Sequence, residues 1–371
     1  MEDVVSTIGD GLWNAVLMAW EVWWALVLGF AISAIVQAWV PRERIEASLS
    51  GSGARPVAVA TGLGAASSSC SYAAIAIARS LFAKGASAAS AIAFQFASTN
   101  LVWELGLILW ILIGWQFAVA EYLGGLVMIG LMWAALRLFI SPRLEARARE
   151  HAQAAEGGHH HGGAGRMPWR ERVRSLDAWS DVARTFLMDW GMLWKEIVIG
   201  FLLAGFIGLL PDSVFQSLFL QDAPPLIRTV ENVIIGPLIA VATFVCSVGN
   251  VPLAAVLWSG GISFAGVLAF IFADLIIVPI VIAYRKFYGR AFAMRMVALM
   301  FVTMVAAALI VDLLFGLAGL IPTERPPTED VFGTIELNYK FVLNVLGLAI
   351  FGAAVALSRR PAAAAMAAHE M

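Results

Sequence analysis

Charged side chains are scarce in this sequence. Asp, Glu, Lys and Arg make up 13% of the 371 residues, apolar residues make up 61%, and the mean hydropathy is +0.83. A soluble domain of this size carries far more polar residues around one core. The net charge of -2 provides no basic excess of the kind that binds nucleic acid. The composition therefore predicts an integral membrane protein and excludes nucleic acid as a partner.

Cysteine and histidine are also few. The two cysteines, Cys70 and Cys246, each lie in an apolar run, and two cysteines cannot form a disulfide framework. No histidine lies in an apolar run, which argues against a Ser/His/Asp triad. No GxxxxGK[ST] loop occurs, which argues against ATP hydrolysis by this chain. The run at 159–161, with His151, could bind a metal, and a low-complexity insert without fixed ligands is the alternative. No cofactor is expected.

Long apolar runs alternate with polar loops. About 20 residues of helix cross the ~30 Å hydrocarbon core of a bilayer. Apolar runs suited to this occupy 12–40, 57–78, 86–114, 117–140, 196–210, 233–258, 262–284, 291–321 and 337–357. The pattern predicts a first membrane repeat at 1–140, a cytoplasmic linker rich in His, Gly and Arg at 141–190, a second membrane repeat at 191–321, and an extra transmembrane helix with a cytoplasmic tail at 322–371.

The two membrane segments are related by an internal repeat. A shift of 176 positions places Cys70 on Cys246. The 33 residues at 70–102 then match those at 246–278 at 12 positions without a gap. The identities include the Cys-Ser pair, Gly85 with Gly261, Ser87 with Ser263, and AFQFA at 93–97 with AFIFA at 269–273. Shared Cys, Gly and Ser at one offset are not explained by apolar composition. We interpret the match as a duplication.

Loop charge predicts that the two repeats are inverted. Lys and Arg in short loops stay on the cytoplasmic side. If the runs 233–258 and 262–284 both crossed the membrane, the loop at 285–295, with its four basic residues, would lie outside. One of the two runs must therefore enter and return. Each half then has three crossings, and the halves have opposite orientations, as in many transporters whose interrupted helices meet near the bilayer midplane.

The sequence CSVGNVP at 246–252 places helix-disrupting residues inside an apolar run. Non-helical backbone at membrane depth is tolerated where protein or a water-filled path covers it. Gly249 permits a turn, Asn250 can bond backbone groups, and Pro252 can begin the next half-helix at its N1 position. A kink packed against neighbouring helices is the alternative. The predicted substrate-binding residues are Cys70, Ser71, Cys246, Ser247, Gly249, Asn250, Pro252 and Asn100.

Thiols and carboxyls inside the apolar runs are the remaining candidates. Two thiols at related positions could bind a soft metal or metalloid, although a buried cysteine also serves as a small apolar residue. Asp274 and Glu104 are expected to bind a proton or cation, because ionisable groups inside a membrane are costly. Asp312, Glu21 and Glu121 lie closer to the predicted ends of runs, and snorkelling or helix pairing explains them.

At the residues CSVGNVP and SSCSYAAI, followed about twenty positions later by AFIFAD and AFQFASTN, the chain resembles the bacterial predicted-permease family of YraQ type. Members carry, twice, a Pro-x-Cys-Ser-Cys-Gly-type motif ending in Pro. The family includes exporters of trivalent organoarsenicals, and the resemblance implies permease activity. Tyr72 and Val248 stand where a second cysteine is usual, and this speaks against a thiophilic substrate.

The sequence thus predicts an all-α polytopic protein of the bacterial inner membrane. It has two inverted repeats offset by 176 positions, interrupted or re-entrant helices at the Cys-Ser motifs, and a C-terminal helix. We expect a permease that moves a small solute, or a metalloid or metal species, by alternating access with ion coupling. The alternatives are an intramembrane enzyme and a non-transporting accessory subunit. Expected partners are membrane lipid, the transported species, a proton or cation, and further copies of this chain.

Overall fold

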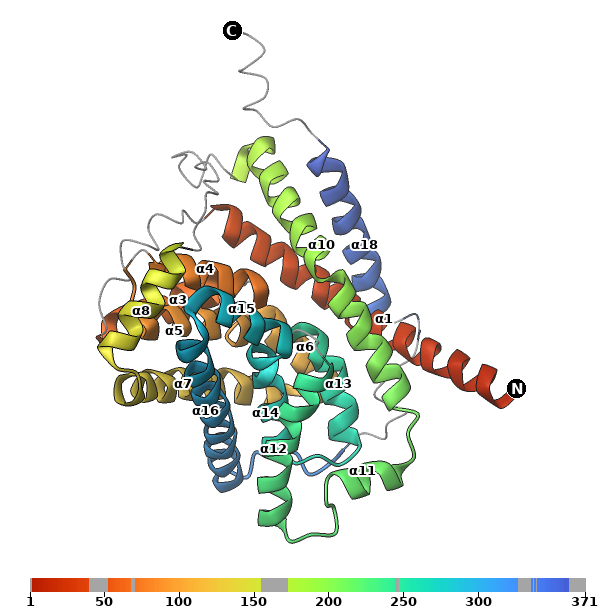
Figure 1. The fold of residues 1–371 in the computed structure, drawn as a ribbon. Coiled ribbons are helices and arrows are strands. Elements are labelled where there is room, and N and C mark those ends of the chain that lie inside the picture. Colours follow the sequence, from red (N-terminus) through yellow and green to blue (C-terminus); the bar gives the residue numbers. More distant parts are fainter. Residues whose placement is uncertain are drawn as a thin grey trace.

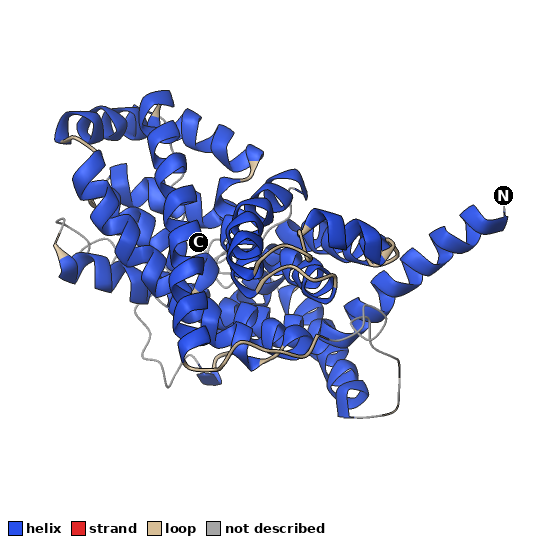
Figure 2. Cartoon of the chain, turned by 90° about the horizontal axis from the view of Figure 1, so that it is seen from below, coloured by secondary structure: helices blue, strands red, loops and turns tan. Residues whose placement is uncertain are grey.

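The computed structural model describes residues 2–39, 53–67, 71–83, 85–154, 173–243, 247–325, 335, 337 and 339–359. Within these ranges the regular elements are helices and there is no strand (Figure 2). Five of the described helical segments are long and apolar enough to cross a membrane: Ala88–Ile113, Trp115–Phe139, Pro225–Thr243, Arg290–Leu317 and Tyr339–Ser358. A sixth span is present if Phe264–Ile276 and Val278–Tyr288, bent by 43°, count as one. The predicted all-α membrane architecture is confirmed.

The helices of the first half are α1 (Glu2–Trp39), α3 (Ala54–Ser67), α4 (Ser71–Ala83), α5 (Ala88–Asn100), α6 (Trp103–Ile113), α7 (Trp115–Phe139) and α8 (Pro142–Ala154). Those of the second half are α10 (Leu176–Ile207), α11 (Asp212–Leu218), α12 (Pro225–Thr243), α13 (Ser247–Ser259), α14 (Phe264–Phe272), the 3-10 turn η1 (Ala273–Ile276), α15 (Val278–Tyr288), α16 (Arg290–Leu317) and α18 (Tyr339–Ser358). Helix α8 and the first turns of α10 lie within the predicted linker at 141–190.

Helix boundaries in the two halves recur at the offset found in the sequence. Helices α4 and α13 both begin and end at equivalent positions of the two repeats, α3 and α12 end at equivalent positions, and α5 and α14 begin at equivalent positions. The N-caps of the last pair have matching geometry: Ser87 has φ -66° and ψ 156°, and Ser263 has φ -67° and ψ 158°. Each serine side chain accepts a hydrogen bond from the amide three residues later, which satisfies a free donor of the helix start.

Glycine ends the helix before each of these caps. Gly85 has φ +114° and Gly261 has φ +103°, a region that side chains with a Cβ rarely adopt. The glycine amides donate to the carbonyls of Phe82 and Trp258, at 3.2 and 3.1 Å. The next amide in each half donates to the carbonyl five residues before it, at 3.0 and 3.2 Å. Both turns are therefore Schellman motifs, which close the helix and reverse the chain. We call them the first and second hairpin tips.

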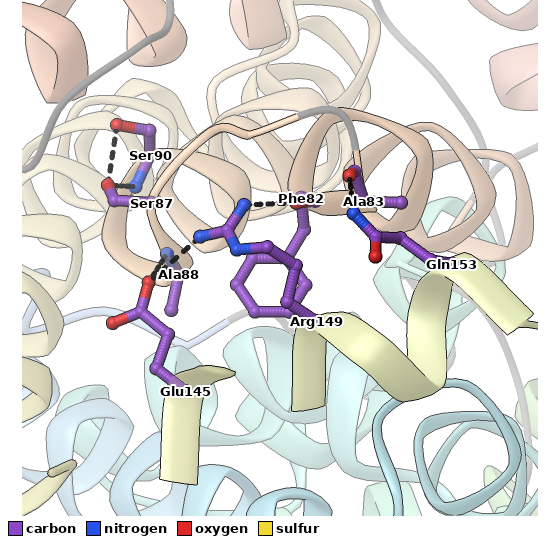
Figure 3. Close-up of polar contacts among 8 residues, drawn as sticks. All are labelled: Phe82, Ala83, Ser87, Ala88, Ser90, Glu145, Arg149 and Gln153. Carbon is purple, nitrogen blue, oxygen red and sulfur yellow. Dashed lines mark hydrogen bonds and ion pairs between the residues drawn. The ribbon is translucent and has the colours of Figure 1, made fainter. Parts of the chain in front are cut away.

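Helix α8 holds the first hairpin tip (Figure 3). Arg149 donates to the carbonyl of Phe82, and its guanidinium lies 4.4 Å from the centroid of the Phe82 ring. Glu145 accepts from the Ala88 amide at 3.0 Å, and Gln153 donates to the Ala83 carbonyl at 2.9 Å. A cation at the C-terminal end of α4 and an anion at the N-terminal end of α5 each complement a helix dipole.

The second hairpin tip is held in the same way. Arg325 donates to the carbonyl of Trp258, and its guanidinium lies 3.8 Å from the centroid of the Trp258 ring. Arg149 and Arg325 occupy equivalent positions at the offset of the repeat, as do the two aromatic residues they contact. The repeat thus extends beyond the apolar runs to a pair of arginine clasps, by which we mean these two arginines on their aromatic residues.

The two halves meet along several helix pairs. Helix α1 packs along α10, α7 packs against α16, and α18 packs against α1 and α10 (Figure 1). Small residues permit close approach, since a Cβ on Gly205 of α10 would lie 2.4 Å from the Gly11 carbonyl of α1. Asn344 of α18 donates to the Trp20 carbonyl at 2.7 Å and accepts from the Trp24 amide at 2.9 Å. These bonds anchor the C-terminal helix to α1.

Candidate functional site

A hydrogen bond joins the two halves at the predicted site. The hydroxyl of Ser71 donates to Oδ2 of Asp274 at 2.8 Å, across 203 residues of sequence. Ser71 is 1% exposed and Asp274 is 0% exposed. Ser71 begins α4 directly after Cys70, whereas Asp274 follows the AFIFA sequence of the second half. The structure therefore brings a predicted substrate residue and a predicted ion-coupling residue together.

A local change of helix type places Asp274. Helix α14 ends at Phe272, the tighter 3-10 turn η1 follows, and α15 begins at Val278 with Pro279 in its first turn. Ile277, between η1 and α15, has extended backbone with φ -63° and ψ 151°, and Pro279, which has no amide to donate, fits the first turn of the helix that follows, so the chain breaks here. Asp274 lies in this break, at the bend of the Phe264–Tyr288 segment. At the position equivalent to Asp274 in the first half is Ser98, whose hydroxyl donates to the Gln95 carbonyl within its own helix.

A second polar contact crosses between the halves close by. Nε2 of Gln95, on α5, donates to the hydroxyl of Tyr284, on α15. Both side chains are fully buried, and Tyr284 interacts electrostatically with Asp274. A hydrogen bond between a buried amide and a buried hydroxyl fixes both side chains. The Gln95–Tyr284 contact therefore lies in the buried surroundings of Asp274.

Glu121 belongs to the same environment. It lies in α7, is 0% exposed, and interacts electrostatically with Asp274. Neither of its carboxyl oxygens has a hydrogen-bond partner in the described part of the chain. One turn later, Gly124 lets the ring of Phe272 approach so closely that a Cβ on Gly124 would lie 2.4 Å from it. Sequence reasoning explained Glu121 by its place near the end of a run. The nearby glycines, which favour close helix packing, were the available signal.

Asn100 and Glu104 lie at the break between α5 and α6. Asn100 is fully buried and donates to the Phe96 carbonyl at 3.2 Å. Glu104 is 6% exposed in the first turn of α6. Tyr122 of α7 donates to the Val102 carbonyl at 3.3 Å and interacts electrostatically with both Glu104 and Glu121. Tyr122 thereby links the predicted ion-coupling residue Glu104 to the environment of Asp274.

The CSVGNVP residues are arranged differently from the prediction. Helix α13 begins at Ser247, so Pro252 is its sixth residue and not its N1 residue. Gly249 is helical, and its carbonyl packs against Gly200 of α10 instead of forming a turn. Asn250 is fully buried, and neither polar atom of its side chain has a hydrogen-bond partner within the described ranges. A buried amide without a partner is costly and marks a place that a polar ligand can satisfy.

Several predictions fall on residues that the structure does not describe. These are Cys70, Cys246, the side chain of Ser247, and the histidines at 159–161. His151 is exposed on α8. Among the described residues, no group of three or more His, Cys, Asp and Glu side chains is arranged to hold a metal ion.

Comparisons with known proteins identify a family and a similar protein. Residues 14–313 match the family model ArsP_1, described as "Predicted permease". The chain is also similar to "Putative permease Rv2963" of Mycobacterium tuberculosis, strain H37Rv, with 46% identity over 286 residues. That match covers 75% of this chain and 70% of the relative. No solved structure matches.

Proposed function

The chain belongs to the predicted-permease family and is therefore a multi-pass membrane transporter, and we propose that it moves a small solute, or a metalloid or metal species, by alternating access between its two membrane repeats. Membership of this family favours a transporter over an intramembrane enzyme. The membrane architecture is consistent with the bacterial inner membrane.

The hydrogen bond between Ser71 and Asp274 carries this proposal. It lies between the halves, and its two residues come from the two segments that the sequence singled out. Transporters built from repeats bind their substrates at the interface between the repeats. A rocking motion of one half against the other would break this bond and expose both polar groups. Substrate binding and repeat motion would then act on the same atoms.

We propose that the two repeats are inverted and that their helices are interrupted at the Cys-Ser motifs. Helix α3 ends at Ser67 and α4 begins at Ser71, while α12 ends at Thr243 and α13 begins at Ser247. The recurrence of these boundaries at the offset of the sequence repeat supports a duplicated unit. Four basic residues at the end of α15 and the start of α16, on either side of Gly289, support opposite orientations of the two units. Free amides at the starts of α4 and α13 favour a negative or partly negative group.

The transported species is proposed to bind next to these helix starts. Cys70 and Cys246 directly precede α4 and α13, and thiols bind soft metalloids such as trivalent arsenic. Asn250, buried near the start of α13, offers an amide to the same species. A trivalent organoarsenical is the probe that the family resemblance suggests, with one thiol in each half because Tyr72 and Val248 stand where a second cysteine is usual. Asp274 and Glu104 are proposed to couple its movement to a proton or cation, because the chain has no nucleotide loop.

Flux measurements on the full chain in lipid vesicles test the proposal. Methylarsenite uptake is measured for the wild type, Ser71→Ala, Asp274→Asn and Cys246→Ala. Ser180→Ala is the matched control, since Ser180 is similarly buried but bonds a carbonyl of its own helix α10. Uptake is expected to fall at least tenfold in the three site variants and to stay near wild type in the control. Wild-type rates in both Ser71→Ala and Asp274→Asn would overturn the proposed site.

A further inference from the structure

We propose that Glu121 and Asp274 form a carboxyl pair that holds one proton inside the membrane, and that this pair is the proton-binding site of the transporter. The inference rests on the proposed transport function and names its coupling ion. It also gives a role to Glu121, which the sequence had not marked.

The position of Glu121 is the first observation. The residue lies about two turns into the membrane-spanning helix α7, with 0% of its surface exposed. Neither carboxyl oxygen has a hydrogen-bond partner in the described part of the chain. A charged carboxylate in such a place loses its water without gaining a donor, and this is one of the most unfavourable arrangements in a protein. A protonated carboxyl carries no charge and avoids this cost.

The electrostatic interaction of Glu121 with Asp274 is the second observation. The Asp274 carboxyl lies within electrostatic range of Glu121, and the close approach of Gly124 to Phe272 brings α7 against the end of α14. Ser71 on α4 and Tyr284 on α15 also face Asp274, and both are neutral. Two buried carboxylates next to each other repel strongly at low dielectric, so one proton shared by the pair is favoured over two charges.

The nearest basic residue along α4 is engaged elsewhere. Arg79 lies eight residues after Ser71, about 12 Å along a helix of 1.5 Å rise per residue. Its guanidinium lies 4.7 Å from the centroid of the Phe287 ring and acts on Tyr288, at the other end of α15 from Asp274. The carboxyl pair is therefore balanced by a proton and not by this arginine.

A proton fits this site better than a metal cation. Hard cations need several oxygen ligands around them, and no group of three or more acidic, His or Cys side chains is gathered in the described ranges. A proton needs one acceptor. Glu121 offers free oxygens, whereas Asp274 already accepts from Ser71. We assign the proton to Glu121 in the conformation seen here.

The pair connects proton binding to the substrate site. When the proton moves from Glu121 to Asp274, the carboxyl of Asp274 becomes a donor and no longer needs the hydroxyl of Ser71. Ser71 is then released to bond the transported species at the start of α4, next to Cys70. Release of this proton from Asp274 to water, followed by uptake of another proton by Glu121, restores the starting arrangement. No bond other than O–H is made or broken in this cycle.

Infrared spectroscopy of the full chain in lipid vesicles tests the pair without any solute. A protonated carboxyl has a C=O stretching band that a carboxylate lacks, and this band is expected in the wild type at neutral pH. It is expected to disappear in Glu121→Gln and to persist in Asp312→Asn, which removes another carboxyl from a membrane-spanning helix. Glu121→Asp is expected to shift the band in frequency. An unchanged band in Glu121→Gln, or in Glu121→Asp if the Gln variant does not fold, overturns the inference.

Transport measurements separate this inference from the proposed function. Exchange of methylarsenite at equal concentration and equal pH on both sides needs no coupling ion, whereas accumulation driven by a pH gradient does. Asp312→Asn is expected to retain both exchange and accumulation, whereas Glu121→Gln is expected to lose gradient-driven accumulation. Accumulation at the wild-type level in this variant overturns the inference. Absence of exchange in the wild type contradicts the proposed substrate and leaves the infrared result to decide on the proton.

Discussion

The arginine clasps allow a prediction of local stability with a magnitude. Replacing Arg325 by Ala removes a hydrogen bond from a charged donor to the Trp258 carbonyl and the stacking of the guanidinium on the Trp258 ring. A hydrogen bond to a charged group contributes about 1.5 to 3 kcal/mol, and a cation over an aromatic ring about 0.5 to 2 kcal/mol. Because the two share one side chain, they are not additive.

Two effects reduce the gain from this clasp. Burial and the neighbouring Arg228 lower the pKa of Arg325 to about 10, so the arginine is charged at neutral pH but at a cost. Water also replaces part of the lost hydrogen bond in the variant. A net destabilisation of the second hairpin tip by about 2 to 3 kcal/mol remains. At 1.4 kcal/mol for each factor of ten, this corresponds to a roughly 30-fold to 150-fold rise in local opening.

Amide hydrogen exchange measures this opening directly, because protected amides exchange through local unfolding. The amides of residues 260–262, which bond within the turn, are expected to exchange faster in Arg325→Ala by that factor. Arg325→Lys keeps the charge but not the planar stacking, so its exchange rates are expected to lie between those of the wild type and Arg325→Ala. In Arg149→Ala the effect at residues 85–86 is expected to be smaller, near tenfold, because Glu145 and Gln153 still hold that tip. Unchanged exchange at 260–262 in Arg325→Ala would refute the reasoning.

Three further predictions concern stability, each measured as the midpoint of thermal unfolding in detergent by tryptophan fluorescence. Asn344→Leu removes two hydrogen bonds between α18 and the backbone of α1 and is expected to lower the midpoint, by a loss of about 0.5 to 2 kcal/mol; an unchanged midpoint would contradict this. Gly124→Ala forces a methyl group against a ring of α14 and is expected to cost about 1 to 3 kcal/mol, whereas Gly130→Ala, with open space around its Cβ on the same helix, is the neutral control. The pKa of Arg325 is lowered to about 10 in the fold, so its charge destabilises the folded state below that pH. This cost disappears as the pH rises from about 10 to the pKa that the arginine has in the unfolded chain. Arg228→Gln removes part of that cost and is expected to raise the midpoint slightly at neutral pH, with the difference disappearing in alkaline buffer; a lower midpoint would show that Arg228 is stabilising.

Local rules allowed much of the fold to be predicted. Glycine at positive φ and serine at a helix start act through their own backbone, and the Gly85/Gly261 and Ser87/Ser263 pairs that revealed the sequence repeat lie at both hairpin tips. Asp274 stood out because a carboxyl inside an apolar run is costly wherever the chain folds. In the structure it accepts a hydrogen bond from Ser71 of the first half.

Other features depend on tertiary contacts that no local pattern encodes. The pairing of Glu121 with Asp274 arises from the packing of α7 on α14, which brings together residues far apart in sequence. Arg149 and Arg325 obey the same offset, but they lie in polar segments outside the apolar match. Pro252 was expected at the first position of a helix, and this was wrong because α13 begins five residues earlier, at Ser247. The preference of proline for the first turn locates a helix start only when other signals agree.

The clasps have a consequence for the order in which the chain is assembled. Each arginine lies 67 residues after the aromatic residue it holds, so each repeat can close its own tip from its own sequence. The bonds between the halves span 189 and 203 residues and need the whole chain. Contacts that are shorter in sequence cost less loop entropy and form first. The first hairpin tip can therefore be closed by Arg149 before the second repeat has been synthesised. The carboxyl environment is completed when the second repeat emerges from the ribosome and docks.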